Sequence, residues 1–217
     1  NFKTQKIQFK NNWAADTVVV MLTVTVLVAL LATFAIAPAP NQCNLTVLYE
    51  SHCSDSRKFI RNVLAPVWPL LETHCTLELV PFGKARSKES GFICHHGEKE
   101  CKSNMVMSCA MRNLLSSRQQ MDFVSCYMGD PDYGGIQCAE KTGLPWADVK
   151  ACMQSGEGTQ LQKEAEAKSY SIRMSRFVPT VVLNDAFNPT DHNEAVGGKF
   201  NKLMCRYTSS SDICSLV

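Results

Sequence analysis

The sequence predicts an α/β fold that is stabilised by disulfides and carries a cysteine-rich helical insertion. Three observations support this prediction. An apolar, β-branched run begins at Leu45 and changes at Cys53 into the helical spacing of apolar residues, and a second strand is expected at residues 77–82. Residues 84 to about 176 have mainly helical patterns and contain six of the 11 cysteines. A further strand is expected at residues 177–183.

The spacing of the first strand, helix and second strand predicts a parallel βαβ unit. Pro66 and Pro69 should kink or end its helix. The insertion separates into candidate helices at 100–117, 119–128, 145–153 and 158–171, with glycine- or proline-rich breaks at 130–135 and 156–158. A closing helix is expected near 193–207, before a tail that ends at Cys214.

The first 40 residues have the pattern of a targeting segment. Three lysines within the first ten residues precede an uncharged apolar run at 18–37, whose length of roughly 20 residues is enough to cross a bilayer. We expect residues 1–40 to be a signal peptide or a signal anchor. Ala35-Ile36-Ala37 favours cleavage, whereas Pro38 and the length of the run oppose it, so both alternatives remain open. Both place residues 41–217 in the lumen or outside the cell, with membrane contact only through the uncleaved segment.

Charge and cysteine content limit the function classes. Residues 41–217 contain 19 basic and 19 acidic side chains, and this balance gives no basic face for nucleic acid. All 11 cysteines follow the apolar run, which predicts structural disulfides in an oxidising compartment. If Cys53 is a free thiol, the other ten suffice for five bridges of unknown connectivity. The sequon that starts at Asn44 fits a lumenal glycoprotein, although it lies close to the first strand.

Cys53 is the candidate nucleophile. Residues 54–56 are of N-cap types, so the thiol should lie beside unpaired amide N–H groups and the positive end of a helix dipole, which favour the thiolate. His52, Arg57 and Lys58 add positive charge nearby. The alternative is a structural cysteine in a disulfide, paired for example with Cys43 or Cys75.

The second thiol of a dithiol oxidoreductase is missing. Such enzymes have Cys-x-x-Cys at this turn, and the second cysteine attacks the mixed disulfide and frees the enzyme. This chain has Ser56 at that position, and a hydroxyl cannot form the disulfide.

A redox cysteine at a strand-to-helix turn, a helical insertion and a late Val178-Pro179-Thr180 before a strand together resemble the thioredoxin fold. The insertion is of the kind seen in bacterial disulfide oxidases. In that fold the late proline is cis and faces the redox cysteine. The resemblance therefore implies a thioredoxin-like fold with a cis-proline at Pro179.

The segment from Cys94 to Cys109 is similar to the signature of the gamma-interferon-inducible lysosomal thiol reductase (GILT) family, Cys-Gln-His-Gly-x-x-Glu-Cys-x-x-Asn-x-x-x-x-Cys. The matching residues are Cys94, His96, Gly97, Glu100, Cys101, Asn104 and Cys109. His95 stands where the family has glutamine. The resemblance covers residues 43–214, the whole predicted lumenal domain.

The resemblance implies a thiol–disulfide oxidoreductase of the lysosomal or endosomal lumen, or a secreted one, that reduces disulfides of protein substrates. The implied site contains Cys53 as nucleophile and Pro179 as cis-proline, and Ser56 at most hydrogen-bonds the leaving sulfur. Without an internal resolving thiol, the expected mechanism is monothiol. No cofactor is expected, and glutathione or cysteine would supply the electrons.

Two other functions remain open: a GILT-like protein that has lost turnover and only binds partners, and a purely structural secreted domain with Cys53 in a bridge. The cluster of Cys94, His95, His96, Cys101 and Cys109 has the residue types of a zinc site. Its spacing fits no usual zinc finger, and an oxidising compartment favours disulfides, so no metal is expected and the histidines are expected at the surface or in hydrogen bonds.

Overall fold

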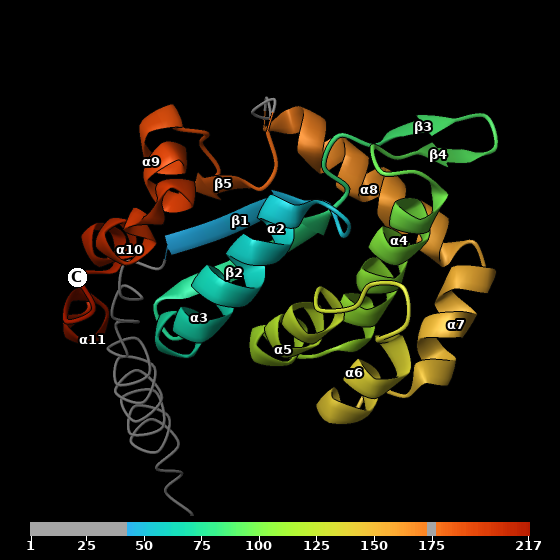
Figure 1. Cartoon of the computed structure of the whole chain (residues 1–217), viewed down its shortest axis with the longest axis horizontal. Helices are drawn as coiled ribbons and strands as arrows, with labels where there is room; N and C mark the ends of the chain where they lie inside the picture. Colours follow the sequence, from blue (N-terminus) through green and yellow to red (C-terminus); the bar gives the residue numbers. More distant parts are fainter. Residues whose placement is uncertain (1–42, 173–176) are drawn as a thin grey trace, which may run out of the picture. The chain divides into compact units, whose positions relative to one another are not determined.

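The computed structural model describes residues 43–172 and 177–217 (Figure 1). The strands are β1 (Cys43–Tyr49), β2 (Cys75–Pro81), β3 (Arg86–Lys88), β4 (Gly91–Ile93) and β5 (Thr180–Leu183). The first helical stretch comprises α2 (Ser54–Phe59), the π-helical segment η1 (Ile60–Leu64) and α3 (Ala65–Leu71). Between β4 and β5 lie α4 (Glu98–Asn113), α5 (Ser117–Tyr127), α6 (Gly135–Thr142), α7 (Trp146–Gln154) and α8 (Glu157–Ser171). After β5 come α9 (Pro189–Glu194), η2 (Ala195–Lys199), α10 (Phe200–Thr208) and α11 (Ser211–Cys214).

The main sheet has the order β2-β1-β5, with β1 in the centre. β1 pairs in parallel with β2 and antiparallel with β5. The parallel pairing of β1 and β2 confirms the predicted βαβ unit. The helical stretch between β1 and β2 returns the chain to the start of β2. The turn with Cys53 therefore lies at the carboxyl end of β1, where the chain leaves the sheet to begin this helix.

Both faces of the main sheet are covered, because alternate residues of its strands point to two apolar cores. Leu45, Val47 and Tyr49 belong to the larger core, which is filled by side chains of the first helical stretch and of α4, α5 and α10. Leu48 belongs to a smaller core on the other face, with Ala165 of α8. Figure 1 shows α8 on the opposite side of the sheet from α2 and α3.

The region from residue 84 differs from the helical prediction in two places. The hairpin of β3 and β4 precedes α4, and α6 occupies residues for which no helix was predicted. β3 is exposed along its whole length, so its sequence has no alternation of apolar and polar residues from which a strand could be recognised. α6 begins directly at Gly135, inside the predicted break.

The first helix does not end at its prolines. It passes through η1 and continues as α3 to Leu71, with Pro66 in the first turn of α3 and Pro69 inside it. A π segment widens the helix locally and is a known accommodation of altered hydrogen bonding. The predicted closing helix is interrupted by a kink within η2, at Gly198, whose φ of 86° is not helical.

Ten of the 11 cysteines form five disulfides. The pairs are Cys43–Cys75, Cys94–Cys101, Cys109–Cys152, Cys126–Cys138 and Cys205–Cys214. Cys53 is free and partly exposed. The expectation of five bridges and one free thiol is therefore confirmed, and a structural bridge from Cys53 to Cys43 or Cys75 is excluded.

The predicted signal peptide or signal anchor at residues 1–40 lies outside the described residues. Among the residues that the structure describes, no helix combines the length and the apolar character that crossing a bilayer requires.

We predict that the Cys109→Ser/Cys152→Ser double variant loses more stability than Cys205→Ser/Cys214→Ser. The first bridge joins α4 to α7 over 43 residues and the second spans nine. Loop-closure entropy then gives losses of about 4 and about 2.6 kcal/mol in the free energy of unfolding. Urea denaturation of both variants and of the unchanged chain measures these losses. Equal losses, or a larger one for the short loop, would contradict loop-closure entropy as the source of the stabilisation by these two bridges.

Candidate active site

Cys53 lies in the turn between β1 and α2, where it is the N-cap residue of the helix. Its backbone is extended, with φ −68° and ψ 122°, and its carbonyl accepts the first helical hydrogen bond, from the Arg57 N–H at 3.0 Å. The thiol therefore lies at the amino end of a helical stretch that continues to Leu71. Backbone N–H groups and the helix dipole favour negative charge at this position, which is where a nucleophilic thiolate is needed.

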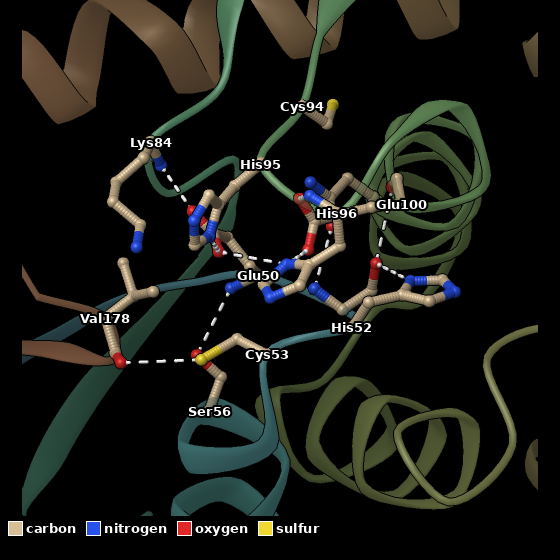
Figure 2. Close-up of polar contacts among 12 residues, drawn as sticks. Glu50, His52, Cys53, Ser56, Lys84, Cys94, His95, His96, Glu100 and Val178 are labelled. Carbon is tan, nitrogen blue, oxygen red and sulfur yellow. Dashed lines mark hydrogen bonds and ion pairs between the residues drawn. The ribbon is translucent and has the colours of Figure 1, made fainter.

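The loop before β5 brings the backbone to the Cys53 thiol. The Sγ atom lies 3.6 Å from the Val178 carbonyl oxygen, to which the thiol donates (Figure 2). The Val178–Pro179 peptide bond is cis, in agreement with the resemblance. Cys53 and the loop that carries Pro179 are thus brought together from positions more than 120 residues apart in the sequence.

Ser56 lies one turn further along α2 and is fully buried. Its Oγ accepts a hydrogen bond from the Glu50 N–H at 3.3 Å. The hydroxyl therefore ties the end of β1 to α2, in the position where a dithiol enzyme has its second sulfur.

Helix α4 holds the turn that precedes Cys53. The buried Ser51 N–H donates to Asn104 Oδ1 at 3.0 Å, and Ser51 Oγ donates to the Glu100 carbonyl at 3.3 Å. Glu100 and Asn104 are one helical turn apart and face the same way. Two matching residues of the signature are therefore used to fix the backbone two positions before the candidate nucleophile.

The loop from Cys94 to Gly97 leads into α4 and is fixed at both ends. The Cys94–Cys101 disulfide closes it, and Gly97 has φ 86° and ψ −170°, a conformation that is nearly restricted to glycine. The Glu100 carboxylate accepts from the His96 backbone N–H at 3.1 Å and lies 2.5 Å from His96 Nδ1. The matching signature residues are thus a scaffold around the turn with Cys53.

Two of the three positive residues expected around Cys53, His52 and Arg57, have partners of their own. His52 Nε2 lies 3.4 Å from Asp132 Oδ1. Arg57 donates to the Met128 and Gly129 carbonyls, each at 2.7 Å, and so joins α2 to the end of α5. These contacts fix the helix that carries the thiol.

A cavity of about 470 Å³ lies between α2 and the loop before β5. Its lining is mainly apolar and comprises Asp55, Lys58, Phe59, Val63, Phe177, Val178, Pro179, His192 and Val196. Phe177 is largely exposed at this cavity. Because the cavity includes both Val178 and the residues that follow Cys53, it is suited to an apolar segment of a polypeptide whose disulfide reaches the thiol.

Sequence reasoning did not assign three residues of this region. Glu50 is a fully buried acid at the end of β1, and the only signal for it was a charged residue directly after an apolar run. The contact of Asn104 with Ser51 could not be predicted without knowing which turn faces α4. His192 lies in α9 and lines the cavity only because α9 packs beside β5.

Cys94, Cys101 and Cys109 are all in disulfides, so none of their sulfurs is available as a thiolate ligand for zinc.

Comparisons with known proteins agree with this geometry. The family model described as "Gamma interferon inducible lysosomal thiol reductase (GILT)" matches residues 44–142. "GILT-like protein 1" of Drosophila melanogaster is 31% identical over 188 residues, which cover 76% of this chain and 75% of the relative. A "Gamma-interferon-inducible lysosomal thiol reductase-like protein" of Anopheles gambiae is 30% identical over 187 residues, covering 77% of each chain.

Among solved structures, DsbA of Chlamydia trachomatis superposes with a TM-score of 0.53 at 16% sequence identity. The superposition covers 78% of this chain and 88% of DsbA. This similarity confirms the thioredoxin-like fold with its helical insertion.

We predict that Asn104→Ala destabilises the chain by about 1–3 kcal/mol, because it leaves the buried Ser51 N–H without an acceptor. Asn113→Ala, at the exposed end of the same helix, is the matched control: it removes one hydrogen bond to the Cys109 carbonyl but leaves no buried N–H without an acceptor, so it should cost less than about 1 kcal/mol. Urea denaturation measures both free energies of unfolding. Equal effects of the two substitutions would show that Asn104 does not hold the turn.

We predict that His192 makes the fold less stable as the pH falls. Burial lowers the pKa of His192, and its Nδ1 accepts a hydrogen bond from the Val181 N–H at 3.3 Å. An unfolded histidine takes up a proton near pH 6.5, so below that pH the unfolded chain binds more protons than the folded one and the stability decreases.

Thermal unfolding between pH 7 and pH 5 tests this. The unfolding temperature of His192→Gln should fall less steeply than that of the unchanged chain, and His74→Gln, which removes a partly exposed imidazole elsewhere, should keep the original slope. The same slope for His192→Gln as for the unchanged chain would contradict the prediction.

Proposed function

Because the chain belongs to the GILT family, we propose that it is a thiol–disulfide oxidoreductase that reduces disulfides of protein substrates through Cys53. One observation carries this proposal: among 11 cysteines, Cys53 alone is unpaired, and it is a partly exposed N-cap residue beside the cis-proline loop. A structural cysteine needs none of these features. A nucleophile needs access, a positive local field and a fixed approach to the substrate.

The proposed reaction begins when the Cys53 thiolate attacks one sulfur of a substrate disulfide. A mixed disulfide forms, and the other substrate sulfur leaves as a thiolate that takes up a proton. The apolar cavity beside Pro179 supports this step, since it can hold the polypeptide next to the scissile bond.

The second half of the cycle is proposed to be monothiol. Ser56 cannot attack the mixed disulfide, and its buried Oγ is already engaged with the Glu50 N–H. A small thiol such as glutathione or cysteine attacks the substrate sulfur of the mixed disulfide and releases Cys53. A second small thiol then releases the substrate as a dithiol. Overall, one substrate disulfide is reduced and two small thiols are oxidised to one small disulfide, without a cofactor.

The proposed location is the lumen of the secretory and endosomal–lysosomal system, or the cell exterior. Five disulfides are typical of proteins that fold in an oxidising compartment, which makes the chain a non-cytosolic protein. The names of its relatives add the lysosome to this proposal.

A second candidate function is favoured by Ser56 itself. Without an internal resolving thiol the mixed disulfide persists until an external thiol arrives, so a chain that meets little external thiol would retain its partner. The protein would then be a covalent binding protein without turnover. The two functions differ only in the fate of the same mixed disulfide.

We predict that the purified chain reduces a disulfide-bonded protein only when glutathione is added, and that Cys53→Ser abolishes this turnover. Ser56→Cys should raise turnover on the order of tenfold or more at millimolar glutathione, because a neighbouring thiol acts at an effective concentration of millimolar or higher. Release of substrate thiols at pH 5 and pH 7 measures all three proteins.

Turnover that survives Cys53→Ser would refute the role of Cys53. A mixed disulfide that forms but resists glutathione in the unchanged chain, and is released in Ser56→Cys, would replace the reductase by the covalent binding protein.

A further inference from the structure

The Glu50 carboxylate is a buried acid with one oxygen that has no hydrogen-bond partner. Its side chain is 0% exposed at the end of β1, three residues before Cys53. Oε1 accepts from the Lys84 N–H at 2.8 Å, whereas Oε2 is buried without any hydrogen-bond partner. A buried carboxylate oxygen without a donor is costly, so this atom calls for a cation or a proton donor that faces it.

Two imidazoles face that oxygen. His95 Nδ1 and His96 Nδ1 each lie 3.5 Å from Glu50 Oε2, and Figure 2 shows both side chains directed toward Glu50 from the loop before α4. One ligand atom from each of the three residues can be chosen so that all lie within 4.8 Å of one another. The loop is held by the Cys94–Cys101 disulfide, so the two rings approach Glu50 from a fixed backbone.

These distances fit a metal ion better than they fit hydrogen bonds. A separation of 3.5 Å is long for an N–H···O bond, whose usual length is about 2.9–3.0 Å. Ligand atoms that bind a tetrahedral zinc ion at about 2.0–2.2 Å lie roughly 3.3–3.5 Å apart. Two histidines and one glutamate are also a known zinc ligand set that leaves a fourth position open.

Glu100 fixes the position of His96. Its carboxylate lies 2.5 Å from His96 Nδ1 and also accepts from the His96 N–H, so it holds the ring and its loop beside Glu50. A metal ion bound at Nδ1 takes the place of the proton in the side-chain contact, and Glu100 then holds the loop through the His96 backbone N–H.

We propose that Glu50, His95 and His96 form a binding site for a divalent transition-metal ion of the zinc class beside Cys53. His95 is the residue that makes such a site specific to this chain. It occupies the one signature position that departs from the family pattern, where glutamine would offer an amide instead of an imidazole. The site does not depend on the proposed reductase activity. It is a separate property of the turn on which Cys53 lies.

Zn²⁺ titration of the purified chain in competition with a chromophoric chelator tests the proposal, in buffer without added thiol. The unchanged chain should bind one equivalent, and His95→Gln should weaken the affinity at least about tenfold. His95 is half exposed, so its replacement should leave the fold intact, as thermal unfolding without metal can verify. His74→Gln, the control for loss of an imidazole, should bind Zn²⁺ as tightly as the unchanged chain.

Cys53→Ser separates this site from zinc capture by the free thiol. Unchanged Zn²⁺ affinity in Cys53→Ser supports the three-residue site. Loss of binding in Cys53→Ser, equal affinity of His95→Gln and the unchanged chain, or no binding by the unchanged chain would each overturn the proposal.

Discussion

The hydrogen bond from the buried Ser51 N–H to Asn104 Oδ1 connects the scaffold to the candidate nucleophile. After β1 the chain leaves the sheet and begins α2 within a few residues. In this turn its backbone N–H groups no longer have the carbonyl acceptors that a neighbouring strand provides. Asn104 replaces the lost acceptor. Because α4 is anchored by disulfides near both ends, Cys94–Cys101 and Cys109–Cys152, its position fixes the turn and therefore the Cys53 thiol.

Through this connection the cysteine-rich insertion positions the turn that carries Cys53. The matching signature residues lie about 40 to 55 residues after Cys53 in the sequence, and none of them supplies a second reactive sulfur. Glu100 and Asn104 instead hold the loop and the turn that face each other across the site. The disulfides remove the freedom of α4 to move away.

Much of the fold was predictable from the sequence because local patterns carry it. The β-branched run before Cys53, the helical spacing after it and the second strand identify the βαβ unit, and the odd number of cysteines identifies the free thiol. The hairpin at residues 86–93 was not predictable, because its exposed residues have no apolar alternation. Pro66 and Pro69 were predicted to kink or end the first helix, which instead continues to Leu71 after the π segment η1.

The site was only partly predictable, because its contacts join distant segments. Nothing in the sequence relates Glu50 to His95 before the fold places them together, and only the resemblance to the thioredoxin fold relates the Pro179 loop to Cys53. Resemblance to the GILT family indicated Cys53 and Pro179, but residues that act by position alone, such as Asn104, have no chemical signature of their own. His192 is similar, since only the packing of α9 brings it to the cavity.

Ser56 and His95 are the two departures from the family pattern in this region, and both lie around the same short turn. The first removes the internal route by which a mixed disulfide is resolved. The second adds an imidazole over a buried carboxylate. Only the first bears on the proposed monothiol mechanism, whose central claim is that release of the Cys53 thiol depends on molecules from outside the chain.

The most direct measurement is the intact mass of the chain after incubation with a disulfide-bonded protein, first without and then with glutathione. The account predicts a covalent adduct on Cys53 that accumulates without glutathione and disappears when it is added. The absence of any adduct, or an adduct that forms equally in Cys53→Ser, would contradict it.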